Sequence, residues 1–182
     1  YYIYKVRLAI FILLLPAFLY AQKSHIILDS LNKAFEESNH DSIKARLMLK
    51  IGNENGKKNP FKAKANYEKA IAYAIAASSK GWQAKAINNL GIIHMNQGDL
   101  NIAYDYFNQS LNLREEINDE FGIAGSLNNI GIIYMYQGNY DKAMEFFFKS
   151  LKLRERLGNN NGVANTINNL SLIHISEPTR PE

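Results

Sequence analysis

The amino-acid sequence predicts an all-α protein, a solenoid of antiparallel helix pairs stacked side by side. Two observations lead to this prediction. The chain repeats itself at a regular spacing of about 40 residues, and each repeat contains two stretches whose small and apolar residues recur with the period of one helix face. A single helix pair cannot bury its outer face, so neighbouring pairs are expected to stack.

The repeat is clearest in the centre of the chain. The step from Tyr67 to Phe107 equals the step from Phe107 to Phe147. Three pairs of asparagines also recur at this spacing, each followed by Leu or Ile: Asn88-Asn89, Asn128-Asn129 and Asn168-Asn169.

Helix boundaries follow from apolar stripes and from Gly and Pro. In the best copy, Ile87, Leu90 and His94 share a stripe, so His94 is expected to be a packed imidazole, and Gly98 supplies the backbone freedom that ends a helix. The expected order is a leading helix at 26–37, a helix at 41–53 with a partner starting at Asn59-Pro60, pairs at 83–97 with 100–117 and at 121–137 with 140–157, and a further helix from Gly162.

The first 21 residues have the pattern of a secretory signal peptide. Lys5 and Arg7 precede an apolar run over residues 8–20, and Ala21 follows as a small residue before polar sequence. The run is shorter than the ~20 residues that span a bilayer as a helix. We therefore expect an exported protein in the periplasm or on the extracytoplasmic side of the inner membrane, with an uncleaved membrane anchor as the alternative. Residues 22–40 then form the leading helix and a linker.

Two central segments resemble tetratricopeptide repeats. Residues 88–113 and 128–153 each carry an aliphatic residue followed by Gly, a Gln-Gly turn, and then Ala, Phe and a small residue before Leu. The resemblance implies a right-handed superhelical α-solenoid over residues 41–170, with about three units and a truncated fourth. The usual unit has about 34 residues and closes with Pro, whereas this one is longer and lacks that Pro. The extra residues at 114–119 and 154–159 are expected to lengthen the second helix by over a turn.

The last residues depart from the repeat. Ser171 stands where the earlier units have Gly, and residues 170–180 read LSLIHISEPTR. This string resembles the translation of an adapter used to prepare sequencing libraries, so residues 171–182 are expected to be adapter-derived and the chain truncated. The alternative is that Pro178 and Pro181 end a short helix before a natural C-terminus.

Composition and motifs argue against several function classes. The 182 residues are 47% hydrophobic with a net charge of +4, spread without a dense basic stripe, so nucleic acid is not an expected partner. Cysteine is absent, and the four histidines form no metal-binding spacing, so no metal and no cofactor are expected. Ser110 and Ser150 have no activating neighbour, so the chain is not expected to be an enzyme.

The resemblance places a binding surface on the concave face formed by the first helix of each pair. A side-chain amide both donates and accepts hydrogen bonds, so the ladder Asn89, Asn129 and Asn169 could pair with a peptide backbone. The alternative is that one asparagine per unit bridges adjacent helices. The candidate contact residues are Asn88, Asn89, Ile92, Met95, Asn96, Asn128, Asn129, Ile132, Met135, Tyr136, Asn168 and Asn169.

These features together predict a scaffold that binds a protein or peptide of unknown identity. Long units behind a signal peptide resemble the exported repeat region of Bacteroidetes-type sensor histidine kinases, which implies the extracytoplasmic sensory region of a truncated bacterial signal-transduction protein. The alternative is a free-standing periplasmic scaffold without an output domain. Membrane contact is expected only through an uncleaved signal or through a transmembrane helix missing downstream.

Overall fold

The computed structural model describes residues 22–176. Within this range the chain forms helices joined by short turns and contains no strand, which confirms the all-α prediction. The predicted signal peptide lies outside the described residues, as do residues 177–182 of the predicted adapter tail.

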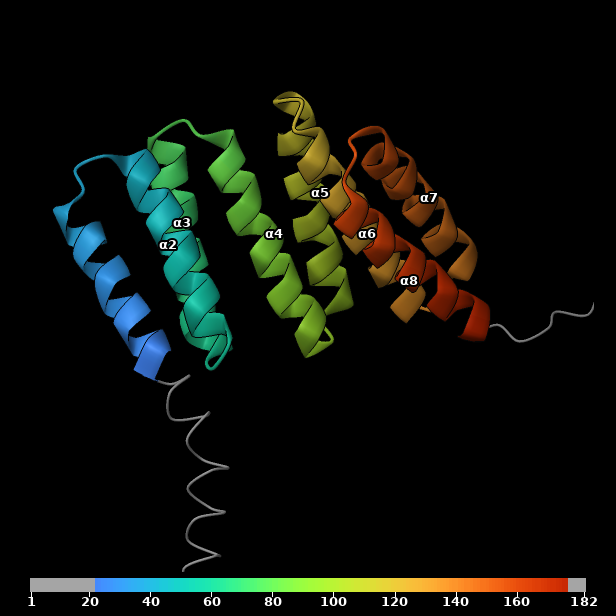
Figure 1. Ribbon diagram of the computed structural model, residues 1–182, viewed down its shortest axis with the longest axis horizontal. Coiled ribbons are helices and arrows are strands. Elements are labelled where there is room, and N and C mark those ends of the chain that lie inside the picture. The colour runs from blue at the N-terminus through green and yellow to red at the C-terminus, as the bar shows by residue number, and fades with distance from the viewer. Residues whose placement is uncertain (1–21, 177–182) are drawn as a thin grey trace, which may run out of the picture.

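The helix pairs follow one another from the N-terminal to the C-terminal end of the array (Figure 1). Residues 22–37 form the leading helix, followed by α2 (Asp41–Gly56), α3 (Pro60–Ala76), α4 (Lys80–Gln97), α5 (Leu100–Glu116), α6 (Glu120–Tyr136), α7 (Tyr140–Arg156) and α8 (Asn160–Ser176). The closest packing is within the pairs α2–α3, α4–α5 and α6–α7, and each pair also packs on the next. The solenoid of stacked helix pairs is thus the observed architecture.

Each pair closes on a glycine that faces an aromatic ring. A Cβ at Gly91 would lie 2.6 Å from Phe107 Cε1, and one at Gly131 would lie 2.7 Å from Phe147 Cδ1. Both phenylalanines have no exposed surface. Only glycine therefore lets the two helices approach this closely around the ring.

The first pair uses the same device. A Cβ at Gly52 would lie 2.4 Å from Tyr67 Cε1. Gly52 stands one position off the spacing that relates Gly91 to Gly131. The missing residue falls between Gly52 and the start of α3 at Pro60, because α2 ends four residues after Gly52 whereas α6 ends five residues after Gly131.

The turns that end each unit share an unusual backbone conformation. Ser78, Asn118 and Gly158, which recur at the spacing of the repeat, have φ angles of 50°, 53° and 65°. Because α5 ends at Glu116, the prediction that residues 114–119 lengthen this helix by over a turn is wrong. Half of that segment is helical and the other half forms the turn.

The second junction, between α5 and α6, is held by a buried arginine. Arg114, 6% exposed, donates from Nη1 to the carbonyl oxygen of Gly122 and to Ser126 Oγ at 3.1 Å. Burial lowers the pKa of Arg114, and the charge of Asp119 partly offsets this effect. A Cβ at Gly122 would lie 2.6 Å from Arg114 Cδ, so the glycine makes room for the arginine to cross the start of α6.

The third junction, between α7 and α8, repeats this arrangement, which we call the arginine clasp. Arg154 Nη1 donates to the carbonyl oxygen of Gly162 and to Thr166 Oγ1 at 2.7 Å. Thr166 has no exposed surface. The clasp thus consists of an arginine near the end of one unit, a glycine eight residues later and a hydroxyl four residues after that.

The first junction, between α3 and α4, has no clasp. The corresponding positions hold Ala74, Trp82 and Ala86, and both alanines are fully buried. Trp82 instead packs against the apolar core shared by α2, α3 and α4. Where the arginine is absent, an indole takes the place of the glycine.

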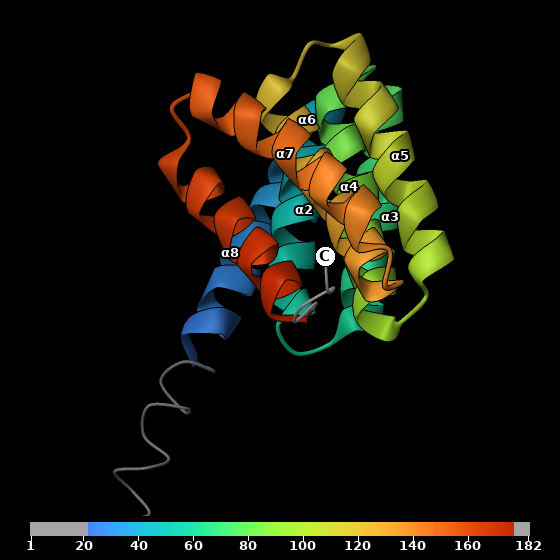
Figure 2. The ribbon, with the colours of Figure 1, turned by 90° about the vertical axis from the view of Figure 1, so that its right-hand side faces the viewer.

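The last helix, α8, packs on α7 and touches α6 (Figure 2). Ile173, 2% exposed, joins the core formed with Phe147 and Ala143. Ser171 is exposed and donates to the carbonyl oxygen of Asn168 at 2.8 Å. Residues 171–176 are therefore compatible with the helix, while the adapter origin of the tail stays a prediction.

Candidate functional site

Amide side chains link successive first helices along one side of the array. Asn129 Nδ2 donates to Asn88 Oδ1 at 3.0 Å, joining α6 to α4, and Asn169 Nδ2 donates to Asn128 Oδ1 at 3.1 Å, joining α8 to α6. We call the surface presented by α2, α4, α6 and α8 the first-helix face. The amide ladder predicted from the sequence lies on it, and its members bridge adjacent helices.

A third bridge joins α2 to α4 with a different donor–acceptor register. Asn89 Nδ2 donates to Asn53 Oδ1 at 3.1 Å, and Tyr67 Oη donates to the same oxygen at 2.8 Å. Leu49 occupies the position that Asn88 has in the next unit, so Asn53, one turn later on α2, provides the acceptor. The sequence interpretation did not identify Asn53, because it falls outside the repeated asparagine pair.

Each bridge leaves hydrogen-bonding capacity unused. An amide has two N–H donors and one carbonyl oxygen, and a bridge consumes one N–H of the first residue and the oxygen of the second. In the described part of the chain, Asn129 Oδ1 and Asn88 Nδ2 have no further partner. Both residues are half-buried and not sealed in the core. A bridge can therefore offer one acceptor and one donor to a ligand, which is what a peptide unit requires.

The predicted contact residues differ in exposure. Asn96, Asn168 and Tyr136 are exposed, the last by 60%, whereas Asn128 is only 8% exposed. The remaining members are half-buried, namely Asn88, Asn89, Ile92, Met95, Asn129, Ile132, Met135 and Asn169. The four apolar ones of these also pack against the cores between units: Ile92, Met95, Ile132 and Met135.

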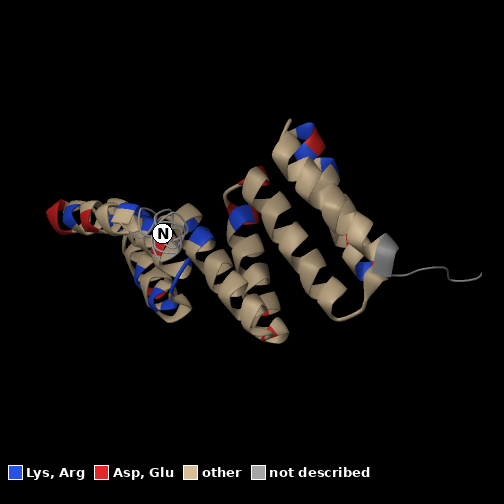
Figure 3. Ribbon diagram, turned by 60° about the horizontal axis from the view of Figure 1, so that its bottom comes forward, with Lys and Arg blue, Asp and Glu red and all other residues tan. Residues whose placement is uncertain are grey.

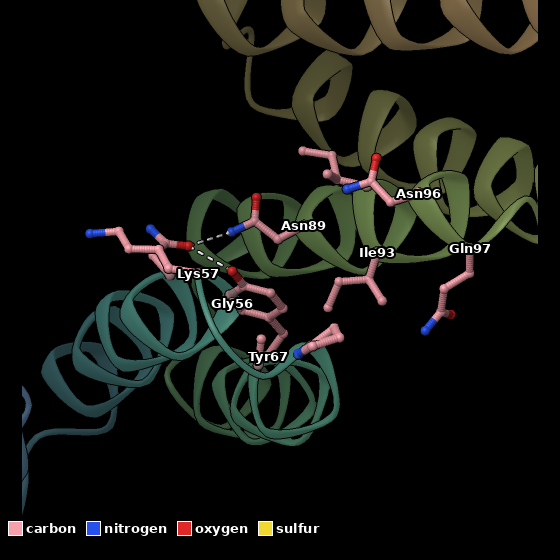
Figure 4. Close-up of a pocket in the computed structure, with 11 residues that line it drawn as sticks. Gly56, Lys57, Tyr67, Asn89, Ile93, Asn96 and Gln97 are labelled. Carbon is pink, nitrogen blue, oxygen red and sulfur yellow. Dashed lines mark hydrogen bonds between the residues drawn. The ribbon is translucent and has the colours of Figure 1, made fainter. Parts of the chain in front are cut away.

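The larger groove of the first-helix face lies where α2, α3 and α4 meet. It encloses about 560 Å³, and its wall contains Tyr67 from α3 with Asn89, Ile93 and Asn96 from α4. Figure 4 shows the Asn53–Asn89 bridge and the Tyr67 hydroxyl at one end of this groove. Burial raises the pKa of Tyr67, and the nearby Asn89 amide partly offsets this, so the hydroxyl stays protonated and donates.

A second groove of about 330 Å³ lies on the other side of the same bridge. It shares Asn53 and Asn89 with the larger groove and adds Trp82 on α4. Its remaining wall is largely basic, with Arg46 and Lys50 from α2 and Lys85 from α4 beside Leu49. The sequence interpretation missed this site, although one signal was available. The single tryptophan of the chain replaces a glycine that the later units keep.

The histidine expected in the core is indeed packed. His94 is 7% exposed, its Nδ1 lies 3.1 Å from Asp99 Oδ2, and its ring stacks on Tyr106 with centroids 5.5 Å apart. In the described part of the chain, no three His, Asp or Glu side chains are grouped as a metal site would require. No helix between residues 22 and 176 is long and apolar enough to cross a membrane.

Comparison with known proteins supplies the family context. The family model for tetratricopeptide repeats matches residues 82–147 and 122–177. No curated protein matches the chain.

Several solved structures share the fold. BtubC (BKLC) from P. vanneervenii superposes with a TM-score of 0.70 at 17% identity, over 85% of this chain and 64% of that one. Aspartyl phosphate phosphatase F from Bacillus subtilis superposes with a TM-score of 0.73 at 18% identity, over 81% of this chain and 40% of that one. The tetratricopeptide repeat domain of Arabidopsis FLU superposes with a TM-score of 0.59 at 22% identity, over 64% of this chain and 98% of that one. The chain thus spans less than two thirds of the first two structures, and at these identities the likeness concerns the fold alone.

Proposed function

The chain belongs to the tetratricopeptide repeat family, and we propose that it is a scaffold that binds an extended segment of a partner protein along the first-helix face. The observation that carries this proposal is the row of amide bridges between successive first helices. Each bridge keeps an unused donor and acceptor at a regular step, and a peptide backbone offers complementary groups at a regular step. Such contacts hold a backbone without fixing its sequence.

The grooves beside the first bridge would supply specificity. A groove of about 560 Å³ accommodates one or two side chains of a peptide, and its walls combine apolar atoms from Ile93 with amides from Asn89 and Asn96. Alternating backbone contacts and side-chain pockets is the usual division between affinity and specificity in peptide recognition.

Selection from a display library of random short peptides on the full chain tests this proposal. The face variant is Asn96→Ala with Tyr136→Ala, which removes two exposed side chains and no amide bridge. The matched control is Phe61→Ala with Phe148→Ala on α3 and α7, at side chains 76% and 56% exposed. We expect the selected peptides to bind the face variant about tenfold more weakly and the control unchanged. Peptides that bind all three proteins equally, or a selection that yields none, would contradict the proposal.

We further propose that this scaffold is the extracytoplasmic sensory region of a longer bacterial signal-transduction protein. Its support is the basic flank at Lys5 and Arg7 before the apolar run of residues 8–20, together with the long repeat unit. Sequencing the gene beyond the codon for Leu170 tests it. An apolar run of ~20 residues followed by an output domain is expected, and a polar helix followed by a stop codon would leave the free-standing periplasmic scaffold instead.

A fusion of the predicted signal peptide and the start of the leading helix to alkaline phosphatase, which is active only after export, tests the location separately. We expect an active fusion. An inactive one would place the array in the cytoplasm and remove the sensory proposal while leaving the peptide-binding scaffold intact.

A further inference from the structure

The first junction of the first-helix face carries positive charge that no described acidic side chain neutralises. Arg46, Lys50 and Lys85 line the smaller groove and are exposed. Among the residues that the structure describes, none of the three forms an ion pair. Three like charges around one groove create a positive potential that attracts a ligand of opposite charge.

The groove also holds one of these charges in place. Lys85 Nζ lies 4.6 Å from the centroid of the Trp82 ring, a distance at which the ring face attracts a cation. The Asn53–Asn89 bridge forms the wall shared with the larger groove, and Asn53 has unused N–H donors within the described chain. A carboxylate in this groove would therefore meet ammonium, guanidinium and amide donors together.

Among the first helices, positive charge is concentrated at this junction. The position of Lys85 holds Gly125 in α6 and Asn165 in α8, and the only charged residue of α6 is Glu120. No Lys, Arg, Asp or Glu occurs in α8. Figure 3 shows the same division, with coloured segments frequent in the N-terminal helices and the bodies of the later first helices tan.

Beyond this junction, the first-helix face presents apolar side chains. Tyr136 on α6 is 60% exposed, and Ile132 and Met135 on the same helix are half-buried. The face therefore changes along its length from a basic groove with an indole to a neutral surface of amides and aliphatic groups.

We infer that the partner segment is an acidic peptide, with Asp or Glu side chains in the groove of Arg46, Lys50 and Lys85 and with apolar residues along α6. This inference rests on the proposed function and adds the chemistry of the ligand. A peptide fits better than a nucleic acid because the cations occupy one junction, whereas a phosphate backbone would carry its charge past the neutral helices as well.

Three fluorescein-labelled probes on the full chain test the inference. They are the peptide EEEEGLGFGL, its counterpart QQQQGLGFGL, and an oligothymidylate of similar length. We expect the acidic peptide to bind at least about tenfold more tightly than the glutamine peptide. That advantage should shrink as salt rises from about 50 to about 500 mM, since screening shortens the reach of exposed charges.

Charge-reversed variants localise the effect. Lys50→Glu with Lys85→Glu should abolish the preference for the acidic peptide. Lys69→Glu with Lys152→Glu makes the same change in net charge on α3 and α7, at exposed residues outside this groove, and should preserve the preference. Far-ultraviolet circular dichroism shows whether both variants remain helical.

The other outcomes separate the two proposals. If both peptides bind equally well, and if the variant Asn96→Ala with Tyr136→Ala weakens their binding, the acidic partner is overturned and the scaffold proposal stands. The same holds if library peptides are selected without enrichment in Asp or Glu, or if the acidic peptide fails to bind where library peptides do. Tighter binding of the oligothymidylate than of the acidic peptide would identify a nucleic-acid groove and overturn the inference.

Discussion

The junction between α3 and α4 and the junction between α5 and α6 join the same elements with different side chains. At the first, Ala74, Trp82 and Ala86 form an apolar contact, and at the second, Arg114 crosses Gly122 to reach a buried hydroxyl. All three positions differ between the two junctions. A Cβ at Gly122 would lie 2.6 Å from Arg114 Cδ, and one at Gly162 would lie 2.8 Å from Arg154 Cδ, so a side chain such as the Trp82 indole fits this position only where the arginine is absent.

The two junctions also differ in the grooves beside them. Both grooves of the first-helix face described above lie at the junction without a clasp, and Trp82 forms part of the smaller one. A clasp fixes the next helix by hydrogen bonds to its first turn, whereas the apolar junction packs through an indole that remains half-exposed to the groove.

The largest effect in this comparison is expected from Arg114→Ala. Removing the guanidinium leaves Ser126 Oγ buried without its partner and opens a cavity at the start of α6. We expect a loss of about 3 kcal/mol in the free energy of unfolding. Because repeat arrays open locally, hydrogen exchange of the α5 and α6 amides is the measurement, with α2 and α3 as the internal reference.

A triple variant determines whether the three positions form a set. Arg114→Ala, Gly122→Trp and Ser126→Ala together rebuild the first junction at the second. We expect this protein to be more stable than Arg114→Ala alone, because the indole fills the cavity and no hydroxyl is left unpaired. A triple variant that is less stable than the single one would show that the two junctions are not interchangeable.

A smaller effect is expected from Gly122→Ala. A Cβ there would meet Asp119 and Arg114 atoms well inside contact distance, so we expect destabilisation of about 2 kcal/mol. Gly125→Ala, one turn later on α6, is the matched control. Its Cβ would lie 3.5 Å from Arg114 Nη1, an ordinary contact, so we expect it to stabilise the helix by up to about 1 kcal/mol. Urea unfolding of the two variants side by side measures the difference, and equal effects would rule out steric exclusion by the clasp.

The smallest effect concerns a buried hydroxyl inside the pairs. Ser110 Oγ donates to the carbonyl oxygen of Ala84 at 2.9 Å, and Ser150 makes the same contact, whereas the first pair has Ala70 there. We expect Ser110→Ala to cost about 1 kcal/mol. The thermal unfolding midpoint, compared with that of the reverse change Ala70→Ser, measures it. A Ser110→Ala protein more stable than the parent would show that the hydroxyl is not a stabilising contact.

Most of the fold could be predicted from the sequence, because the regular period marks both helices of each pair. The glycine–phenylalanine contact needs no structure to be foreseen, since Gly91 and Phe107 recur as Gly131 and Phe147. The matching glycine–aromatic contact of the first unit was harder to predict. The segment from Gly52 to the start of α3 is one residue shorter than the matching segments after Gly91 and Gly131, which places Gly52 one position off the repeat.

The site was less predictable, for physical reasons. The asparagine ladder was placed on the correct helices, but the sequence could not decide whether its amides bridge helices or await a ligand, since one amide can do both. The buried Arg114 and the basic groove were missed because charged residues near helix ends are usually solvated. One repeat position distinguishes the buried arginine from the basic groove. It holds Gly122 at the junction with the arginine and Trp82 at the junction with the groove.

The left-handed turn at Ser78, Asn118 and Gly158 has a consequence for how such a chain can change over time. Each residue added to or removed from a helix rotates everything after it by about 100°, which would turn a buried stripe toward water. A turn whose backbone suits few residues resists that slippage by fixing where one unit stops. Residue types can then differ inside the units, as at Ala74 and Trp82, while the spacing from one such turn to the next stays at 40 residues.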